Sequence, residues 1–255
     1  MQKTTFPLKM AVAVLSFAVI ACVIGTPAPT ATPVPTNTPV PPTDTPLPTA
    51  TATDVPTPTA TPNVAATQQA EQLQALLVEL KDKGYVDTTE GNARPLDDFS
   101  QDWSDVAHYN WWTVTDQPIG DFVLTGHLNW QTASSNTNGI SGCGIIFGLQ
   151  DNDDFYGVFV DESRIQFTLR RGTYLYDVGV TSGNGRLKFG NPAETDLVLV
   201  VKGQKAYVNV QGDYISYTLS ADQTSHGILA YTMLSSSATG YGTRCKMTNM
   251  TLWTP

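Results

Sequence analysis

The second half of the sequence alternates apolar and polar residues with a period of two, the pattern of a half-buried β-strand. In the first such run, Phe122, Leu124, Leu128 and Trp130 fall on one face, and mostly polar residues fall on the other. Further short runs follow, rich in β-branched or aromatic residues and bounded by turn residues, at 142–149, 155–160, 165–170, 174–180, 197–202, 206–210, 214–219, 227–233 and 245–253. About ten strands with no helical pattern between them predict an all-β sandwich or barrel.

The chain begins with a segment of a different kind. Lys3 and Lys9 form a short basic start, and residues 10–20 are apolar. This composition predicts a secretory signal peptide. A transmembrane helix is the alternative, but a bilayer span needs about 20 apolar residues and this run is shorter.

Residues 19–22, Val-Ile-Ala-Cys, resemble the lipobox of bacterial lipoproteins. In that family the signal is cut before the cysteine, and the cysteine carries lipid. The resemblance implies a signal peptide over 1–21, lipidation of Cys22, and a protein anchored by lipid to the outer face of the bacterial cell membrane. An ordinary cleaved signal that leaves Cys22 as a free thiol is the alternative.

Residues 22–62 consist mainly of Thr, Pro and Ala and carry almost no charge. Such a composition cannot bury enough apolar surface to fold, and its prolines favour extended polyproline II. At about 3.1 Å per residue, forty residues reach on the order of 120 Å. We therefore expect a disordered stalk between the lipid and the folded part.

The chain has three cysteines: Cys22, Cys143 and Cys245. An odd cysteine in a secreted protein needs an explanation, and lipidation of Cys22 supplies one. The remaining two then form a natural pair in an oxidising compartment. A disulfide that closes a loop of about 100 residues stabilises a fold by up to ~4.7 kcal/mol. We expect this disulfide; two buried free thiols are the alternative.

Residues 63–84 predict one amphipathic helix, because apolar residues recur at steps of four and three. Gly84 is the expected C-terminal cap. The helix is expected to pack on the domain that follows or to be loosely attached, and a coiled coil is the alternative. The apolar stripe consists of Ala66, Ala70, Leu73, Leu77 and Leu80.

Residues 85–121 are the most acidic part of a chain with formal net charge −9. This charge argues against nucleic acid and against an anionic membrane surface as partners. A solvated face is the usual explanation of such a run, and a calcium site is the alternative. We expect residues 85–255 to form one β-sandwich domain, long enough to bury a core without metal.

Four segments carry a resemblance to a known superfamily: GIIFGLQDNDDFYGVFVDESRIQFTLRRG, LVLVVKGQKAYVNVQGDYIS, GILAYTM and MTNMTLW. They resemble the concanavalin A-like lectin/glucanase superfamily, in particular its laminin-G-like and 3-keto-disaccharide hydrolase-type domains. The resemblance covers about residues 95–255 and implies an antiparallel jelly-roll β-sandwich. It also implies that Cys245, on the last strand, lies near an early strand. This fold hosts lectins, glycosidases and inert spacers alike.

The sequence contains little that resembles a catalytic motif. The glucanases of this superfamily carry Glu-x-Asp-x-x-Glu on one strand, but here Glu194 and Asp196 are followed by Leu199 in the third position. Serine-hydrolase and zinc motifs are also missing from the sequence. We expect no catalysis, with a glycoside or keto-disaccharide hydrolase as the alternative.

Sugar sites pair an aromatic platform with planar polar side chains. If Trp111 and Trp112 are on one strand, they point to opposite faces, so at least one is a candidate ligand residue. Arg170, Tyr174 and Tyr176 flank a predicted hairpin and are candidates for one shared surface. For each aromatic residue taken alone, a place in the core is the competing explanation.

The run that contains Asp151, Asp153 and Asp154 offers oxygen ligands for calcium, although a solvated hairpin loop explains it equally simply. We expect no other cofactor. The sequence thus predicts a monomeric, non-catalytic surface lipoprotein whose sandwich binds glycan or another extracellular polymer. A structural or adhesion module without a small ligand is the remaining alternative.

Overall fold

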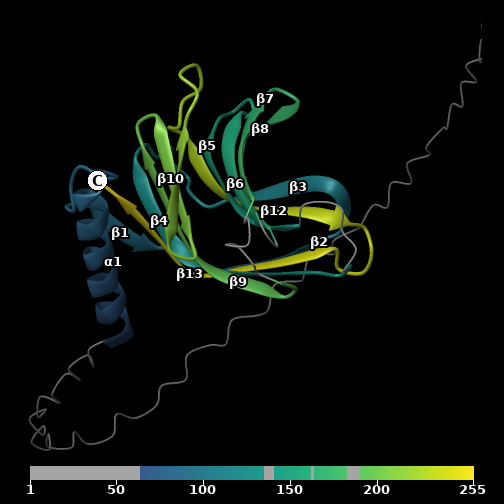
Figure 1. Ribbon diagram of the computed structural model, residues 1–255, viewed down its shortest axis with the longest axis horizontal. Helices are drawn as coiled ribbons and strands as arrows, with labels where there is room; N and C mark the ends of the chain where they lie inside the picture. Colours follow the sequence, from purple (N-terminus) through teal and green to yellow (C-terminus); the bar gives the residue numbers. More distant parts are fainter. Residues whose placement is uncertain (1–63, 135–140, 162–163, 183–189) are drawn as a thin grey trace, which may run out of the picture. The chain divides into compact units, whose positions relative to one another are not determined.

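The alternating runs form two antiparallel sheets that pack face to face. The computed structural model describes residues 64–134, 141–161, 164–182 and 190–255. These residues belong to the compact unit Ala60–Pro255. Their strands belong to sheet A or sheet B (Figure 1), so the predicted all-β sandwich is confirmed.

Sheet A has seven strands, with β2 pairing beside β1 along the same long strand, β13. Every pairing in the sheet is antiparallel. In spatial order its strands are β1 (Asn92–Pro95) and β2 (Phe99–Trp103), β13 (Thr243–Thr254), β4 (Phe122–Thr132), β9 (Ala193–Lys202), β10 (Lys205–Val210) and β11 (Asp213–Thr218).

Sheet B has six strands, again all antiparallel. Figure 1 shows it strongly curved, with β7 and β8 standing away from β3 and β12. In spatial order its strands are β3 (Asp105–Thr113), β12 (Ile228–Ser237), β5 (Gly142–Leu149), β6 (Phe155–Asp161), β7 (Arg164–Arg171) and β8 (Tyr174–Ser182).

The main core lies between the sheets and takes the inward-facing residues of both. Alternation explains its composition, because every second side chain of a strand points to the same face. At the open edge, the Phe167 ring of β7 stacks on the Tyr217 ring of β11 with centroids 4.3 Å apart. The expected disulfide is present: Cys143 of β5 and Cys245 of β13 join the two sheets, with Cα atoms 5.6 Å apart.

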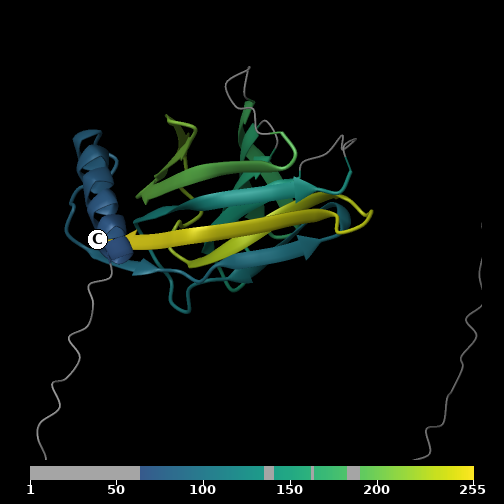
Figure 2. The ribbon, with the colours of Figure 1, turned by 90° about the horizontal axis from the view of Figure 1, so that it is seen from below.

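The expected helix is α1 (Val64–Asp82), and it packs on sheet A rather than standing free. Leu77 and Leu80 are buried against Val123, Val200 and Trp253, which lie on the outer face of that sheet. Figures 1 and 2 show α1 beside the C-terminus in both views.

The C-terminus of α1 forms the predicted glycine cap. Gly84 has φ +74°, its N–H donates to the Lys81 carbonyl, and the Tyr85 N–H donates to the Leu80 carbonyl. These two bonds are those of a Schellman motif, in which glycine adopts the left-handed conformation without steric cost. Ala66 and Ala70 of the predicted stripe are exposed, so only the C-terminal half of the stripe meets the sheet.

The acidic segment 85–121 is more structured than its charge suggested, because it contributes β1, β2 and β3. Its carboxylates lie on edge strands and on the segments between them, and all except the partly buried Asp105 are exposed. The predicted signal peptide, the predicted lipidation site Cys22 and the predicted stalk lie outside the described residues. Within the described ranges, no helix is both long and apolar enough to cross a bilayer.

Candidate functional site

The outer face of sheet B, turned away from sheet A, carries a cluster of aromatic rings. Tyr109 and Trp111 come from β3, and Phe155 and Phe159 come from β6. The Tyr109 ring centroid lies 5.9 Å from that of Trp111, 5.8 Å from that of Phe155 and 6.3 Å from that of Phe159. Tyr109 and Trp111 are half-buried and cover the two fully buried phenylalanines.

The curvature of sheet B brings these rings together. Strands β12 and β5 separate β3 from β6, so in a flat sheet β3 and β6 would be roughly 14 Å apart. Ring centroids within 6 Å across that span require a concave face. The outer face of sheet B is therefore concave, with β3 on one side and β6 and β7 on the other.

Glycines keep the floor of this face low. A Cβ on Gly144 would come within 2.6 Å of the Val158 carbonyl oxygen, and one on Gly157 would come within 2.8 Å of the Thr168 hydroxyl. Neither position has room for a side chain, so the aromatic rings can pack directly above the backbone of β5 and β6 at these two glycines. The Thr168 hydroxyl donates to the Gly157 carbonyl, which leaves the buried hydroxyl satisfied.

Arg170 of β7 closes the cluster. Its guanidinium carbon lies 5.5 Å from the Trp111 ring centroid and 5.8 Å from that of Phe155, a cation–π geometry. Arg170 Nη1 donates to the Asp153 carbonyl at 3.2 Å and lies 3.5 Å from the Asp153 carboxylate. Burial raises the pKa of Tyr109, with the Arg170 charge opposing that rise. The Tyr109 phenol therefore stays neutral as a hydrogen-bond donor at physiological pH.

Trp111 and Arg170, both predicted from the sequence, thus meet at one site. Trp112 points the other way, as expected for adjacent residues of one strand, and packs against the main core between the sheets. Tyr109 and Phe155 were not predicted as site residues. Only the pairing of β3 through β12 and β5 to β6 reveals them, and no local pattern records that pairing.

The predicted grouping of Arg170 with Tyr174 and Tyr176 is wrong. In the β7–β8 hairpin, Arg171 pairs with Tyr174 and Arg170 pairs with Leu175. Paired residues share a face, so the two tyrosines lie on the opposite face from Arg170. They are 67 % and 50 % exposed on the edge strand β8, with ring centroids 6.2 Å apart.

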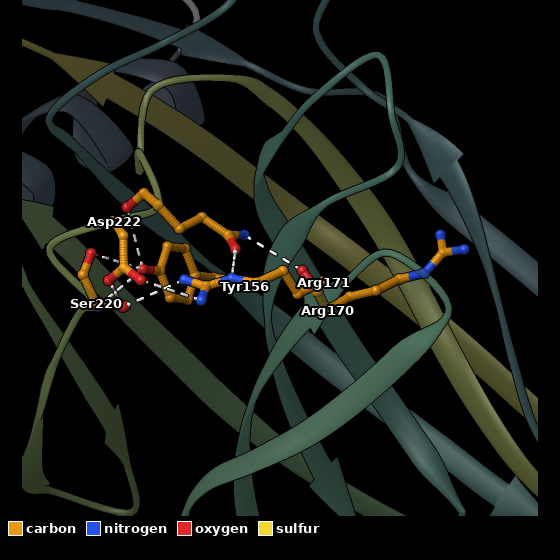
Figure 3. A network of polar contacts seen from close by, with 6 residues as sticks. Tyr156, Arg170, Arg171, Ser220 and Asp222 are labelled. Atoms are coloured by element: carbon orange, nitrogen blue, oxygen red, sulfur yellow. Dashed lines mark hydrogen bonds and ion pairs between the residues drawn. The ribbon is translucent and has the colours of Figure 1, made fainter.

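The neighbouring arginine anchors a loop instead of facing the cluster, and Figure 3 shows Arg170 and Arg171 pointing in opposite directions. Arg171 donates to the Asp222 carboxylate at 3.2 Å and to the Ser220 hydroxyl at 3.3 Å. The buried Tyr156 hydroxyl accepts from the Ser220 N–H at 2.9 Å. Hydrogen bonds from the Ser220 hydroxyl and the Asp222 backbone, together with the Arg171 charge, lower the pKa of Asp222.

This loop also supports the site. Gln223, from the same β11–β12 connection, donates from its amide nitrogen to the Arg170 carbonyl at 3.4 Å. The Arg170 backbone is thus held from one side by Gln223, while its side chain is held from the other by Asp153. The sequence offered no signal for this loop, whose residues are ordinary turn formers.

The candidate calcium site is not supported by the geometry. Asp153 contacts Arg170, and the Asp154 carboxylate accepts from the Gly172 N–H at 2.6 Å and from Asn152 at 3.0 Å. Asp151 is exposed. Across the described parts of the chain, no three His, Cys, Asp or Glu side chains gather as a metal-binding group. Hydrogen bonds that close the β5–β6 turn account for the acidic run.

The two acids of the incomplete glucanase motif have a histidine partner. On the outer face of sheet A, His127 Nδ1 lies 2.8 Å from the Asp196 carboxylate, and Nε2 lies 3.8 Å from that of Glu194. Register explains this, because β4 and β9 pair His127 directly with Asp196. Both carboxylates are largely exposed, and neither has the buried setting that tunes a catalytic acid.

The comparisons with known proteins give similarities to solved structures. No protein-family model matches the sequence, and neither does any curated protein. The chain is similar to the solved structure of carbohydrate-binding module CBM66 from Bacillus subtilis, with 11% identity, TM-score 0.45, and coverage of 64% of this chain and 96% of that one. It is also similar to sheep galectin-11 in complex with glycerol (10% identity, TM-score 0.35, coverage 55% and 98%) and to Bacillus licheniformis beta-glucanase (12% identity, TM-score 0.39, coverage 58% and 71%).

Proposed function

We propose that this chain is a lipid-anchored extracytoplasmic protein whose sandwich binds carbohydrate, without cleaving it, on the outer face of sheet B. One observation carries the binding part: the Arg170 guanidinium lies against the half-buried Trp111 ring beside Asp153. An aromatic ring can stack on the C–H face of a sugar, while planar donors and a carboxylate bond its hydroxyls.

The site is preorganised for such a ligand. Asp153 fixes the Arg170 side chain, and Tyr109 and Phe155 pack around Trp111. Groups already fixed in the free protein lose little conformational entropy when a ligand binds. The guanidinium offers several N–H donors at one edge, which suits neighbouring hydroxyls of a sugar ring.

The location rests on the sequence alone. The lipobox-like segment, lipidation at Cys22 and the Thr/Pro-rich stalk would place the sandwich outside the cell and away from the membrane surface. The Cys143–Cys245 disulfide fits an oxidising compartment. Radiolabelled fatty acid that enters the wild-type chain but not Cys22→Ala would support the anchor, and equal labelling of both would overturn it.

A binding screen tests the carbohydrate part. The unit 60–255 is screened against glycans and polysaccharides by affinity electrophoresis and calorimetry. We expect Arg170→Gln and Trp111→Leu to weaken binding at least about tenfold, the value of a good charged hydrogen bond or an aromatic contact. Arg244→Gln, which removes the same charge from an exposed pair on sheet A, is the matched control. Binding unchanged in the sheet B variants would refute the site.

The same screen separates binding from hydrolysis. Reducing-sugar release from any polysaccharide that binds would favour the glycosidase alternative, whose nearest candidate groups are His127, Glu194 and Asp196. We expect no release by the wild-type protein. Release that disappears in Asp196→Asn would assign catalysis to sheet A and contradict the non-catalytic proposal.

Adhesion by strand pairing is a second candidate function, favoured by the exposed apolar side chains of β8. Leu175 and Val178 are 38% and 45% exposed beside the two tyrosines, on an edge strand with free backbone groups. Such edges accept strands of other chains. Tyr176→Lys should abolish any capture of cells or envelope protein by immobilised 60–255 if this is the function, and should leave glycan binding intact because Tyr176 lies on the opposite face from Arg170.

A further inference from the structure

A hollow opens between the two sheets, on the side of β3 opposite Trp111. Its volume is about 410 Å³, and it lies between the edge strand β3 and the segment that joins β1 to β2. The segment is fixed, because the Leu96 N–H donates to the Met250 carbonyl at 2.9 Å and the Tyr231 hydroxyl donates to the Asp97 carbonyl at 3.3 Å. The hollow is thus a built feature of the fold rather than a gap between moving loops.

The inner wall of this hollow is aromatic. The Trp112 and Phe99 ring centroids are 5.0 Å apart, and those of Phe99 and Tyr231 are 5.3 Å apart. Phe99 and Tyr231 are buried, whereas Trp112 is only partly buried and lines the opening. A ligand that enters would therefore meet the indole of Trp112.

The rim of the hollow carries three charged side chains. Asp97, Asp98 and Arg94 all line it and are all exposed. Among the described residues, none of these three side chains makes an ion pair, although nearby Asp102 is held by Arg244 through two bonds of 2.8 Å. Two carboxylates and one guanidinium give the rim a net negative charge.

The negative field reaches the aromatic wall. Burial raises the pKa of Tyr231, and the Asp97 and Asp98 carboxylates raise it further, while Arg94 opposes them. The negative charges of both carboxylates are therefore felt at the aromatic wall inside the hollow as well as at its exposed rim. The chain's net charge of −9 adds a long-range attraction for cations.

We propose that this hollow binds a small organic cation, with a primary ammonium group between Asp97 and Asp98 and its apolar carrier against Trp112. The carboxylates attract the charge, and the indole ring gives the apolar carrier a flat surface to stack on. An amino sugar and a lysine side chain share this chemistry. The site is independent of the proposed glycan face, because Trp111 and Arg170 lie on the other face of sheet B.

Paired probes that differ only in charge test the proposal. The unit 60–255 is titrated by calorimetry with glucosamine and N-acetylglucosamine, and with a lysine peptide and its Nε-acetylated form. We expect the charged member of at least one pair to bind, with an affinity that falls as salt rises, and its acetylated partner not to bind. The pair that responds identifies the source of the cation. Equal affinity within both pairs, or no binding of either cation, would overturn the proposal.

Variants locate the site. We expect Asp98→Asn to weaken binding of the cation about five- to tenfold, and Arg94→Gln to strengthen it about twofold or more because a like charge is removed. Glu71→Gln, which neutralises an exposed carboxylate on α1, is the matched control and should change nothing. Trp112→Phe keeps a ring for the core and should weaken binding severalfold.

Two results would place the cation elsewhere: equal effects of Asp98→Asn and Glu71→Gln, or weaker binding by Arg94→Gln. Arg170→Gln separates this proposal from the proposed function, because it should leave cation binding unchanged while it removes glycan binding. Failure of glycan binding would therefore leave the cation site standing, and the reverse also holds.

Discussion

The guanidinium of Arg170 lies over the ring of Trp111, although strands β12, β5 and β6 stand between the strands that carry them. A flat sheet would hold β3 and β7 roughly 19 Å apart. The contact therefore depends on the curvature of sheet B and on the low glycine floor beneath the rings.

A double-mutant cycle on this pair should show energetic coupling. We expect Arg170→Gln and Trp111→Leu to be non-additive by about 0.5–1 kcal/mol in the free energy of unfolding, the usual value of a cation–π contact. Urea unfolding of the four proteins, followed by circular dichroism, measures it. Additivity within about 0.3 kcal/mol would mean that the contact contributes nothing to stability.

Removal of the disulfide should weaken the fold considerably. Cys143 and Cys245 join the two sheets across a sequence separation of 102 residues. We expect the double variant Cys143→Ser, Cys245→Ser to lose about 2–5 kcal/mol of unfolding free energy, because the bond restricts the unfolded chain. Wild-type protein treated with a reductant is the control. A loss below about 1 kcal/mol in both would contradict the expectation.

The close packing around Gly144 in sheet B leads to a further prediction. Gly144→Ala should destabilise the protein by about 1–3 kcal/mol, because the new Cβ would meet the Val158 carbonyl oxygen and the Phe159 ring within 3 Å. Gly120→Ala is the control, since its Cβ would meet only a His226 ring atom at 3.5 Å. Thermal unfolding distinguishes the two variants. Equal stability of both would show that the groups around Gly144 can shift to accommodate the added methyl group.

The sequence predicted the sandwich because apolar and polar residues alternate in β4, and because the later strands are short runs of β-branched and aromatic residues between turn residues. The sequence did not reveal β1 to β3, because their acidic and polar residues show no alternation of apolar and polar positions. For example, the first residue of β2 is buried and the next three are exposed. These edge strands owe their conformation to pairing with β13 and β12 rather than to their own pattern. Tertiary pairing of this kind outweighs local β-propensity.

The site was predictable only in part. Trp111 and Arg170 were each identified by residue type, but their meeting depends on the order of five strands. The prediction that Tyr174 and Tyr176 share a face with Arg170 failed for a simpler reason. A one-residue change of hairpin register moves every side chain to the other face, and the sequence does not fix that register. The Trp112 hollow depends on the β1–β2 segment, which no sequence pattern placed beside β3.

The exposed pair of Asp102 and Arg244 predicts a small dependence on pH. The hydrogen bonds that the Asp102 carboxylate accepts from Arg244 lower the pKa of Asp102 below its ordinary value of 3.8. A lowered pKa in the folded state means that the pair stabilises the protein above pH 4 and loses this effect as the carboxyl is protonated on acidification. We expect Arg244→Gln to lower Tm at pH 7 by at most about 2 °C, because both groups are largely exposed.

The test of that pair is the difference in Tm between wild type and Arg244→Gln across pH. The difference should shrink toward zero as pH falls from 5 to 2. Lys83→Gln, which breaks the exposed pair between Lys83 and Glu79 of α1, serves as a control for general charge effects. A difference that grows on acidification would reverse the assigned sign.

The helix α1 should behave as part of the sandwich, because its C-terminal half covers apolar residues of sheet A. Leu80 is fully buried with Val123, Val200 and Trp253, whereas Val78, two residues earlier, is 47% exposed. We expect Leu80→Ala to cost about 2–5 kcal/mol of unfolding free energy and Val78→Ala to stay within about 0.5 kcal/mol.

Truncation tests the same dependence on a larger scale. A chain that begins at residue 85 would expose Val123, Val200 and Trp253 to water and lose the Leu77 and Leu80 contacts. We expect its unfolding midpoint in urea to fall below that of Leu80→Ala, because it loses more buried apolar area. If instead both changes leave the midpoint where it is in the unit 60–255, α1 is only loosely attached to the sandwich, and the apolar patch beneath it tolerates water.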